Sequence, residues 1–374
     1  MIKNDTPLKV LVVDDAILYR TVISEVLSEL PGISVVGSAG NGRIATNRIR
    51  SLQPDILTLD IEMPEMNGLE VLEWMRENAP DVGAIVFSSF THKGGDMTVK
   101  ALNLGAFDFI QKIAADTMKE NKAALKNAIV PMLKAFARRK EVRQLLKGKS
   151  ALPKVETEKR TLSGHPLAPG RADIFYGPGS SVIAIAISTG GPEALGKMLP
   201  KIPGDINVPI LIVQHMPAAF TQSITSGLNA KSAIEVRAAT DGEILRDNTA
   251  FFAPGGKQMK IEKSADGKNM LIRVTDDHPE NNCKPSADYL FRSIAHHYGN
   301  RATGVIMTGM GSDGTLGLKL MKRSGAFIIA QDEETCTVFG MPKKPIETGI
   351  VDIVAPLDRI AEEICRTVSV GKQK

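Results

Sequence analysis

Cysteine is scarce in this chain of 374 residues, which holds only Cys283, Cys336 and Cys365. None of the three belongs to a Cys-x-x-Cys pair or to a spaced Cys/His set, so we expect no structural zinc site. An odd and sparse set of cysteines suits a reducing compartment, where disulfide bonds are rare. We therefore expect a cytoplasmic protein.

Long hydrophobic runs and strong net charge are also missing. The longest apolar run, residues 182–187, is far too short to span a bilayer, and the polar residues 1–9 do not read as a signal peptide. The net charge is +4 and the basic residues form no stripe, which disfavours nucleic acid as a partner. We expect no membrane insertion and a monomer, although the sequence by itself leaves the oligomeric state open.

The first half of the chain alternates between short apolar runs and amphipathic stretches. Five strands alternating with five helices predict a parallel sheet with helices on both faces, the flavodoxin-like arrangement. The predicted strands cover residues 10–13, 33–36, 56–59, 84–87 and 107–110. The predicted helices cover residues 16–30, 43–52, 69–77, 96–104 and 116–138.

The pattern breaks and then resumes, which divides the chain into three parts. Residues 1–140 form the first predicted domain, and residues 141–178 lack sustained periodicity and predict a flexible linker. Residues 179–374 predict a second, doubly wound α/β domain. Its strand-like runs are residues 182–187, 210–213, 304–307 and 326–329.

Carboxylates stand at strand ends in the first domain. Asp14 and Asp15 follow the first predicted strand and Asp60 follows the third. Open parallel sheets place their sites at this edge, and carboxylates that converge there repel one another unless a cation such as Mg²⁺ lies among them. A carboxylate can also act as a nucleophile toward phosphorus. The alternative is that each aspartate only caps a helix.

Two more polar residues end strands at the same edge. Ser88 follows the fourth strand and Lys112 the fifth, which adds a hydroxyl and a cation able to contact a phosphoryl group. With the runs 10–15 and 60–68 they make the first third of the chain similar to a response-regulator receiver domain. One departure is Ile113, which stands where proline usually follows the lysine.

The resemblance implies phosphorylation of Asp60 by a partner histidine kinase. It also implies Mg²⁺ in the receiver. The implied metal ligands are Asp14, Asp15, Asp60 and the backbone carbonyl of Glu62. The implied switch residues are Ser88, the rotamer-changing Phe109 and Lys112.

The second domain begins with a serine at a sharp corner. Strand 182–187 runs into Ser188-Thr189-Gly190-Gly191-Pro192, where the glycines permit a tight turn and the proline suits a first helical turn. A serine at a sharp turn between a strand and a helix is the arrangement of a nucleophile elbow, although the sequence is not G-x-S-x-G. Alternatively, Ser188 caps the helix or belongs to a phosphate-binding turn.

A histidine and an aspartate follow the neighbouring strands. His215 ends the next strand and Asp313 follows the strand 304–307, so the three side chains suit a Ser-His-Asp triad. Backbone N–H groups of the glycine-rich loop, Met310 among them, are candidates for an oxyanion hole. His215 could instead be a satisfied core or loop histidine, and His278 is its main rival as the catalytic base.

These motifs resemble the catalytic domain of the chemotaxis protein-glutamate methylesterases, the CheB family. The order of receiver, linker and esterase is specific to that family. The matching stretches are residues 188–191, 214–216, 252–255, 285–291, 308–314, 331–332 and 339–342. Two departures are Ile187 in place of a small residue and the polar, Asn-rich loop 277–284 in place of a more basic one.

The resemblance implies hydrolysis of glutamate methyl esters on the cytoplasmic domains of chemoreceptors, with glutamine deamidation by the same acyl-enzyme route. It implies no metal or organic cofactor for the esterase. We expect the receiver to inhibit the esterase until Asp60 is phosphorylated. Two other classes stay open: a phosphorylation-gated binding module without turnover, and a DNA-binding response regulator.

Overall fold

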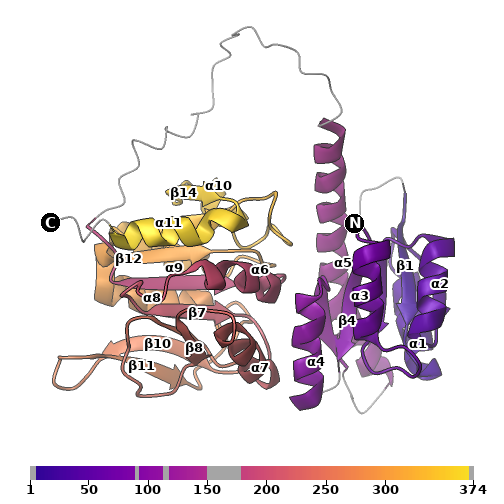
Figure 1. The fold of residues 1–374 in the computed structure, drawn as a ribbon, viewed down its shortest axis with the longest axis horizontal. Helices are drawn as coiled ribbons and strands as arrows, with labels where there is room; N and C mark the ends of the chain where they lie inside the picture. The colour runs from indigo at the N-terminus through magenta and orange to yellow at the C-terminus, as the bar shows by residue number, and fades with distance from the viewer. Residues whose placement is uncertain (1–5, 89–91, 113–117, 150–177, 370–374) are drawn as a thin grey trace, which may run out of the picture.

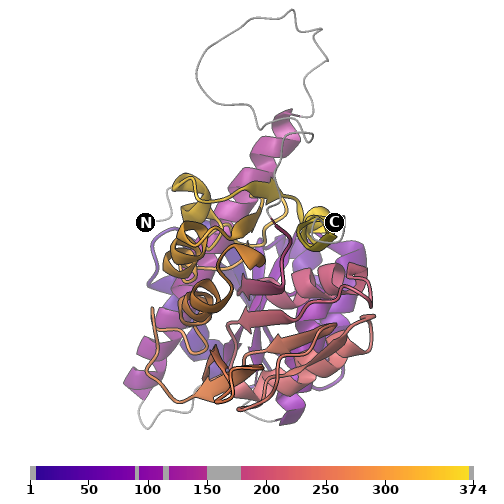
Figure 2. The same ribbon diagram turned by 90° about the vertical axis from the view of Figure 1, so that its left-hand side faces the viewer.

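The computed structural model describes residues 6–88, 92–112, 118–149 and 178–369. They form two α/β domains that lie side by side, with the N-terminal domain drawn in indigo to magenta (Figure 1). Helix α5 belongs to the N-terminal domain and extends beyond its sheet (Figures 1 and 2). Within the described residues, no helix is both long enough and apolar enough to cross a membrane.

The N-terminal domain is a five-stranded parallel sheet in the order β2-β1-β3-β4-β5, as the sequence predicts. Its strands are β1 (Leu8–Val13), β2 (Ile33–Ala39), β3 (Ile56–Asp60), β4 (Gly83–Ser88) and β5 (Asp108–Gln111). Its helices are α1 (Ile17–Ser28), α2 (Gly42–Leu52), α3 (Gly68–Asn78), α4 (His92–Asn103) and α5 (Met118–Lys149).

Local sequence explains where these elements begin. Asn67 accepts hydrogen bonds from the start of α3 while Glu70 reaches back to the Asn67 N–H, a reciprocal capping box. Strand β3 is buried along its whole length, which is typical of a parallel sheet covered on both faces.

Helix α5 differs from the sequence prediction. We expected it to end at residue 138 and the flexible linker to begin at residue 141, yet the helix continues to Lys149. Most of residues 141–149 are strong helix formers such as Glu, Arg, Gln, Leu and Lys, so propensity supports the extension. The rest of the predicted linker, residues 150–177, lies outside the described residues.

The C-terminal domain is a seven-stranded parallel sheet in the order β14-β13-β12-β6-β7-β9-β8, with a separate β10-β11 hairpin. Its strands are β6 (Val182–Ile187), β7 (Ile210–Gln214), β8 (Glu235–Ala238), β9 (Thr249–Phe252), β10 (Gln258–Lys263), β11 (Met270–Thr275), β12 (Ala302–Ile306), β13 (Phe327–Gln331) and β14 (Ile353–Ala355). Its α-helices are α6 (Gly191–Met198), α7 (Ala218–Asn229), α8 (Ala287–Tyr298), α9 (Thr315–Arg323), α10 (Lys343–Glu347) and α11 (Leu357–Ser369). The 3₁₀ turns are η2 (Leu199–Lys201) and η3 (Gly299–Arg301).

Strand β6 shows why the sheet is doubly wound. Ile183, Ile185 and Ile187 point into one core, which also receives α6, α7 and α11. Val182, Ala184 and Ala186 point into the other core, which receives α8, α9 and the hairpin. Because successive strand residues face opposite sides, a run that is apolar throughout needs both faces covered. The sequence predicted this strand; it missed β8, β9 and β14, which are only three or four residues long, and also both strands of the β10-β11 hairpin.

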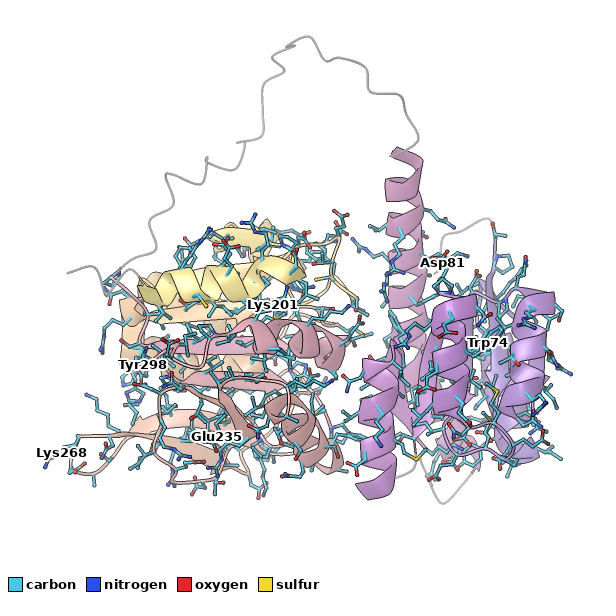
Figure 3. The ribbon with its side chains drawn as sticks, in the orientation of Figure 1. Trp74, Asp81, Lys201, Glu235, Lys268 and Tyr298 are labelled. Carbon is cyan, nitrogen blue, oxygen red and sulfur yellow. The ribbon has the colours of Figure 1, made fainter. Side chains whose placement is uncertain are left out.

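The two domains touch through helix α4. It packs against α6 and α7 of the C-terminal domain, and side chains of both domains project into this contact (Figure 3). Val99 of α4 is buried in the same core as Phe220 of α7. Phe109 of β5 meets Phe220 edge to face, with ring centroids 4.8 Å apart. The carboxyl edge of the C-terminal sheet, where β6 and β7 end, therefore faces the N-terminal domain.

Candidate functional site

Ser188 follows β6 directly, at the corner where the chain turns into α6. Its carbonyl accepts hydrogen bonds from the Gly191 N–H at 2.7 Å and from Gln214 Nε2 at 3.0 Å. Gly190 has φ 76°, and an added Cβ there would lie 2.4 Å from the Thr337 side chain, so this position requires glycine. These constraints fix the corner and hold the half-buried serine at the edge of the sheet.

His215 occupies the matching position on the neighbouring strand. The β6-β7 register pairs Ile187 with Gln214, so Ser188 and His215 follow as the next residues of adjacent strands. The His215 N–H also donates to the Ile187 carbonyl at 3.1 Å. His278, the rival histidine, is exposed on the loop after β11. The strand register thus places the imidazole of His215 beside the serine corner.

Asp313 meets His215 from the loop between β12 and α9. Its Oδ2 lies 2.8 Å from His215 Nε2, and the carboxylate is almost fully buried. The start of α8 supplies further donors to this carboxylate. They are the Ser286 hydroxyl at 2.8 Å, the Ala287 N–H at 2.6 Å and the Asp288 N–H at 3.2 Å. The sequence motif at 285–288 carried the family resemblance but no assigned role; its task here is to hold Asp313.

Ion pairing sets the protonation of this pair. Burial works against the charged form of Asp313, but the hydrogen bond and charge of His215, with the donors of α8, lower its pKa to about 2. Burial likewise disfavours a charged imidazole, but Asp313 and the nearby Cys283 raise the pKa of His215 to about 9. The carboxylate and the thiol thus both favour the charged form of the imidazole, against the effect of burial.

Ser188 and His215 line one cavity of about 280 Å³ together with Met310. Residues of the N-terminal domain form its other wall: Leu102, Asp108, Phe109, Ala128, Pro131 and Met132. Among the described residues, no hydrogen bond joins the Ser188 hydroxyl to His215. The serine and the histidine thus share a cavity that the N-terminal domain covers.

Met310 lies on the loop that passes closest to the serine. At the neighbouring Gly309, an added Cβ would lie 2.8 Å from Ser188 Cβ and 2.4 Å from Met341 Sδ, so only glycine permits this approach. The Gly309 N–H is occupied by the Val338 carbonyl at 3.0 Å. For the Met310 N–H, no partner occurs within the described part of the chain. The assignment of this N–H to an oxyanion hole stays a prediction.

The acidic residues of the N-terminal domain converge as the strand ends require. Carboxylate oxygens of Asp14, Asp15 and Asp60 lie within 4.8 Å of one another. Lys112 Nζ lies 2.7 Å from Asp60 Oδ2 and 3.0 Å from Asp14 Oδ2. Burial raises the pKa of Asp60 to about 6, against the opposing effect of Lys112. A cluster of hard oxygen ligands at this edge fits a divalent cation such as Mg²⁺.

The other residues predicted for this pocket, Ser88, Glu62 and Phe109, differ in their burial and contacts. Ser88 is buried at the end of β4 and accepts a hydrogen bond from Thr98 Oγ1 at 2.5 Å. Glu62 lies exposed just beyond the end of β3, and its carbonyl accepts no hydrogen bond from another described residue. The ring of Phe109 packs edge to face against Phe220 at the domain contact. The pocket and the domain contact are therefore linked through β5.

Polar contacts cross between the domains beside Ser188. Thr189 Oγ1 donates to Asp108 Oδ2 at 2.6 Å, and burial raises the pKa of Asp108 to about 6. Ser223 of α7 donates to Asp96 of α4.

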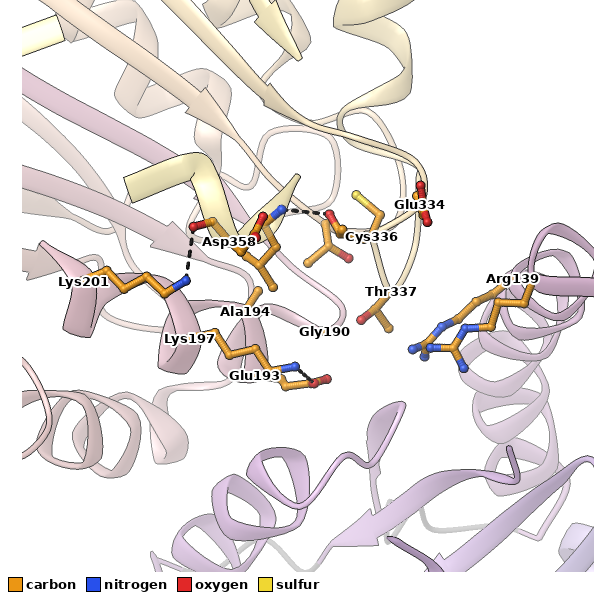
Figure 4. A pocket seen from close by; sticks show the side chains of 14 residues that line it. Arg139, Gly190, Glu193, Ala194, Lys197, Lys201, Glu334, Cys336, Thr337 and Asp358 are labelled. Atoms are coloured by element: carbon orange, nitrogen blue, oxygen red, sulfur yellow. Dashed lines mark hydrogen bonds and ion pairs between the residues drawn. The ribbon is translucent and has the colours of Figure 1, made fainter. Parts of the chain in front are cut away.

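A second cavity, about 480 Å³ in volume, lies between α5 and the loop before Phe339. Arg139 points across it toward Thr337, while Lys197 pairs with Glu193 (Figure 4). Burial and the like charge of Arg143 lower the pKa of Arg139 to about 10. This cavity contains neither Ser188 nor His215.

Comparisons with known proteins agree with this architecture. Residues 10–123 match the family model of the response regulator receiver domain, and residues 183–364 match that of the CheB methylesterase. The protein-glutamate methylesterase/protein-glutamine glutaminase of Desulfotalea psychrophila is 50% identical, over 96% of this chain and 98% of its own. That of Bacillus subtilis is 39% identical, over 96% and 98% respectively.

A solved structure also aligns with the C-terminal domain. The crystal structure of the Thermotoga maritima CheB methylesterase catalytic domain is 36% identical, covering 50% of this chain and 99% of that one, with a TM-score of 0.49. The relatives align over nearly their whole length with nearly the whole of this chain. The chain therefore belongs to the CheB family of protein-glutamate methylesterases/protein-glutamine glutaminases that carry a receiver domain.

Proposed function

We propose that this chain hydrolyses glutamate methyl esters on the cytoplasmic domains of chemoreceptors and deamidates glutamines there, with Ser188, His215 and Asp313 as its catalytic residues. The supporting observation is the His215 Nε2–Asp313 Oδ2 contact of 2.8 Å in a cavity that His215 shares with Ser188. Such an acceptor holds the imidazole in one tautomer and orientation. We also propose that the protein acts in the cytoplasm, where the receptor domains are available, and that it is a monomer.

The reaction follows from the positions of the ring nitrogens. Because Nε2 is engaged by Asp313, Nδ1 is the nitrogen left to take the proton from the Ser188 hydroxyl. The serine oxygen then attacks the ester carbon, and the imidazolium returns the proton to the departing methoxide, which leaves as methanol. Water repeats the sequence on the acyl-serine and releases the glutamate carboxylate. A glutamine side chain would lose ammonia by the same steps.

The oxyanion of each tetrahedral intermediate needs hydrogen-bond donors. We assign the Met310 backbone N–H to this role, because its loop approaches Ser188 at Gly309 and its N–H has no partner in the described part of the chain. One such donor typically stabilises the transition state by about 3 kcal/mol. The chemistry requires no metal or organic cofactor at this site.

In the receiver we propose that Asp60 accepts a phosphoryl group from a partner histidine kinase. Asp14, Asp15, Asp60 and the carbonyl of Glu62 would hold Mg²⁺, which offsets the charge of the phosphoryl oxygens. Lys112, already 2.7 Å from Asp60, would move to a phosphoryl oxygen. Ser88 would donate its hydroxyl to the same group, and Phe109 would change rotamer.

The domain contact gives phosphorylation a route to the esterase. In the unphosphorylated form, receiver residues wall the cavity of Ser188 and His215, so a substrate side chain cannot enter from that direction. A rearrangement of Ser88 and Phe109 would disturb the Phe109–Phe220 contact and open the cavity. Only a state-dependent contact of this kind can shift the equilibrium between closed and open forms.

The decisive experiment is methanol release from methylated receptor. Wild type should release methanol, Ser188→Ala should not, and phosphodonor should accelerate the wild type but not Asp60→Asn. An isolated fragment of residues 178–374 should be active without phosphodonor. If Ser188→Ala retains the wild-type rate, the catalytic assignment is wrong; if all forms match with and without phosphodonor, the inhibition is wrong.

A further inference from the structure

Cys283 lies beside the catalytic imidazole without a role in the steps above. Its Sγ is 4.0 Å from His215 Nδ1. With Asp313 the two residues form a group whose nitrogen, sulfur and oxygen ligand atoms all lie within 4.8 Å of one another. Cys283 and His215 are both half-buried, so an ion from solvent can reach them. The other cysteines lie elsewhere, Cys336 in the second cavity and Cys365 on α11.

The contact with Asp313 prepares His215 to bind a metal. In the neutral ring, Nε2–H donates to the carboxylate and the lone pair lies on Nδ1, the nitrogen that faces the thiol. A carboxylate that orients the second nitrogen of a ligating histidine is the usual arrangement around protein-bound zinc. The donors of α8 hold Asp313 in turn, so the imidazole is fixed before any ion arrives.

The separation of the two ligand atoms suits one small cation. Zinc binds sulfur at about 2.3 Å and imidazole nitrogen at about 2.0 Å, which places two tetrahedral ligands roughly 3.5 Å apart. The observed 4.0 Å needs only a small movement of the Cys283 loop. Two basic side chains nearby have acidic partners: Lys284 lies 3.3 Å from Asp276, which it shares with Lys257, and Arg292 pairs with Glu280. These contacts reduce the repulsion that Lys284 and Arg292 would exert on a metal ion.

We propose that His215 Nδ1 and Cys283 Sγ bind a divalent cation that prefers nitrogen and sulfur ligands, Zn²⁺ in the cell, and that this site is inhibitory. Binding releases the thiol proton, together with the Nδ1 proton of any protonated imidazole, and leaves positions on the metal for water. It also occupies the lone pair that must accept the Ser188 proton, so the bound enzyme is inactive. The inhibition rests on the proposed function, whereas the binding itself does not.

Cobalt tests the binding without reference to activity. Full-length protein, with the acidic pocket saturated by excess Mg²⁺, is titrated with Co²⁺ and followed by absorption. We expect a sulfur-to-cobalt charge-transfer band that saturates at one equivalent and disappears when Zn²⁺ is added. Cys283→Ser and His215→Gln should abolish the band, and the matched control Cys365→Ser should keep it. Absence of the band from the wild type, or its persistence in Cys283→Ser, overturns the proposal.

Methanol release then tests the inhibition. Zn²⁺ should lower the wild-type rate in proportion to the occupied fraction measured by competition with Co²⁺, and Cys283→Ser should resist the same Zn²⁺ concentration. Circular dichroism of Cys283→Ser checks that the variant is folded, and Cys283→Ala serves as a second variant. Equal Zn²⁺ inhibition of folded Cys283→Ser would refute the inhibitory site. A wild type without esterase activity but with the cobalt band would instead refute the proposed function.

Discussion

Thr189, the residue after the proposed nucleophile, donates a hydrogen bond of 2.6 Å to Asp108 of the receiver. Asp108 immediately precedes Phe109, whose ring contacts Phe220. One short segment of β5 therefore touches both the serine corner and helix α7. This segment joins the acidic pocket, through Lys112, to the cavity of Ser188 and His215.

Removal of the Asp108 carboxyl should loosen the cover. Asp108→Ala deletes the acceptor of the Thr189 hydroxyl, and a lost buried hydrogen bond costs about 1 kcal/mol. We expect the methanol-release rate of the unphosphorylated full-length protein to rise roughly fivefold, since 1.4 kcal/mol is about a factor of ten. Asp108→Asn, which keeps an acceptor without charge, is the matched control and should not raise the rate. Equal rates for Asp108→Ala and wild type would exclude this contact from the closed state.

The same carboxyl predicts a pH dependence of the inhibition. In the closed state the pKa of Asp108 is raised to about 6 from its usual 3.8 by burial. The closed form thus holds the proton more tightly than an open form in which Asp108 is solvated, so acidification from about pH 6 toward pH 4 favours closure. The rate of the full-length protein divided by that of the 178–374 fragment should fall as pH decreases. In Asp108→Asn this ratio should lose most of its pH dependence.

Replacement of Asp313 should greatly lower the rate, although this residue acts on the ester only through His215. Asp313→Asn keeps the size of the side chain but presents an amide to His215 Nε2, which favours the wrong tautomer. By analogy with other Ser-His-Asp enzymes, kcat should fall by about 10⁴. Methanol release gives the rate, and thermal unfolding shows whether the loss is structural. Asp332, an aspartate of a neighbouring loop outside this cavity, offers a control in Asp332→Asn. A loss in Asp313→Asn below tenfold would argue against the assigned role.

The raised pKa of His215 predicts a rate that increases with pH. Burial lowers its pKa, but Asp313 and Cys283 raise the value to about 9. Because catalysis needs the unprotonated ring, kcat/KM should rise with pH toward about 9. Cys283→Ser removes one of the two raising influences, so its midpoint should shift to lower pH, whereas Cys365→Ser should match the wild type. A midpoint that Cys283→Ser leaves in place would show that the thiol does not influence the imidazole.

Mg²⁺ binding to the receiver should weaken in mild acid. Burial raises the pKa of Asp60 to about 6, so below that pH the carboxyl takes up a proton and one metal ligand loses its charge. Calorimetric titration should therefore give a higher Kd at pH 5 than at pH 8. Asp60→Asn removes the titrating group and should bind Mg²⁺ weakly, with little pH dependence. The opposite trend would place Asp60 outside the metal site.

Strand ends could be located from the sequence because their signals are local. A buried strand is a continuous apolar run, and Asp60, Ser188 and His215 each stand at the end of one. Since parallel strands share one carboxyl edge, the order of the chain was enough to place such residues together. The alternation of apolar runs and amphipathic stretches in residues 1–140 and 179–374 likewise predicted two α/β domains.

Only the tertiary structure decided what surrounds those residues. The contacts of Asp313 with Ser286 and Ala287, and that of His215 with Cys283, join segments far apart in the chain. No periodicity signals such contacts, because they depend on how helices pack on the finished sheet. The Thr189–Asp108 hydrogen bond is even harder to predict from the sequence, because it forms only where the two domains meet. The sequence therefore determined the chemistry that is present, and packing decided which groups cover and tune it.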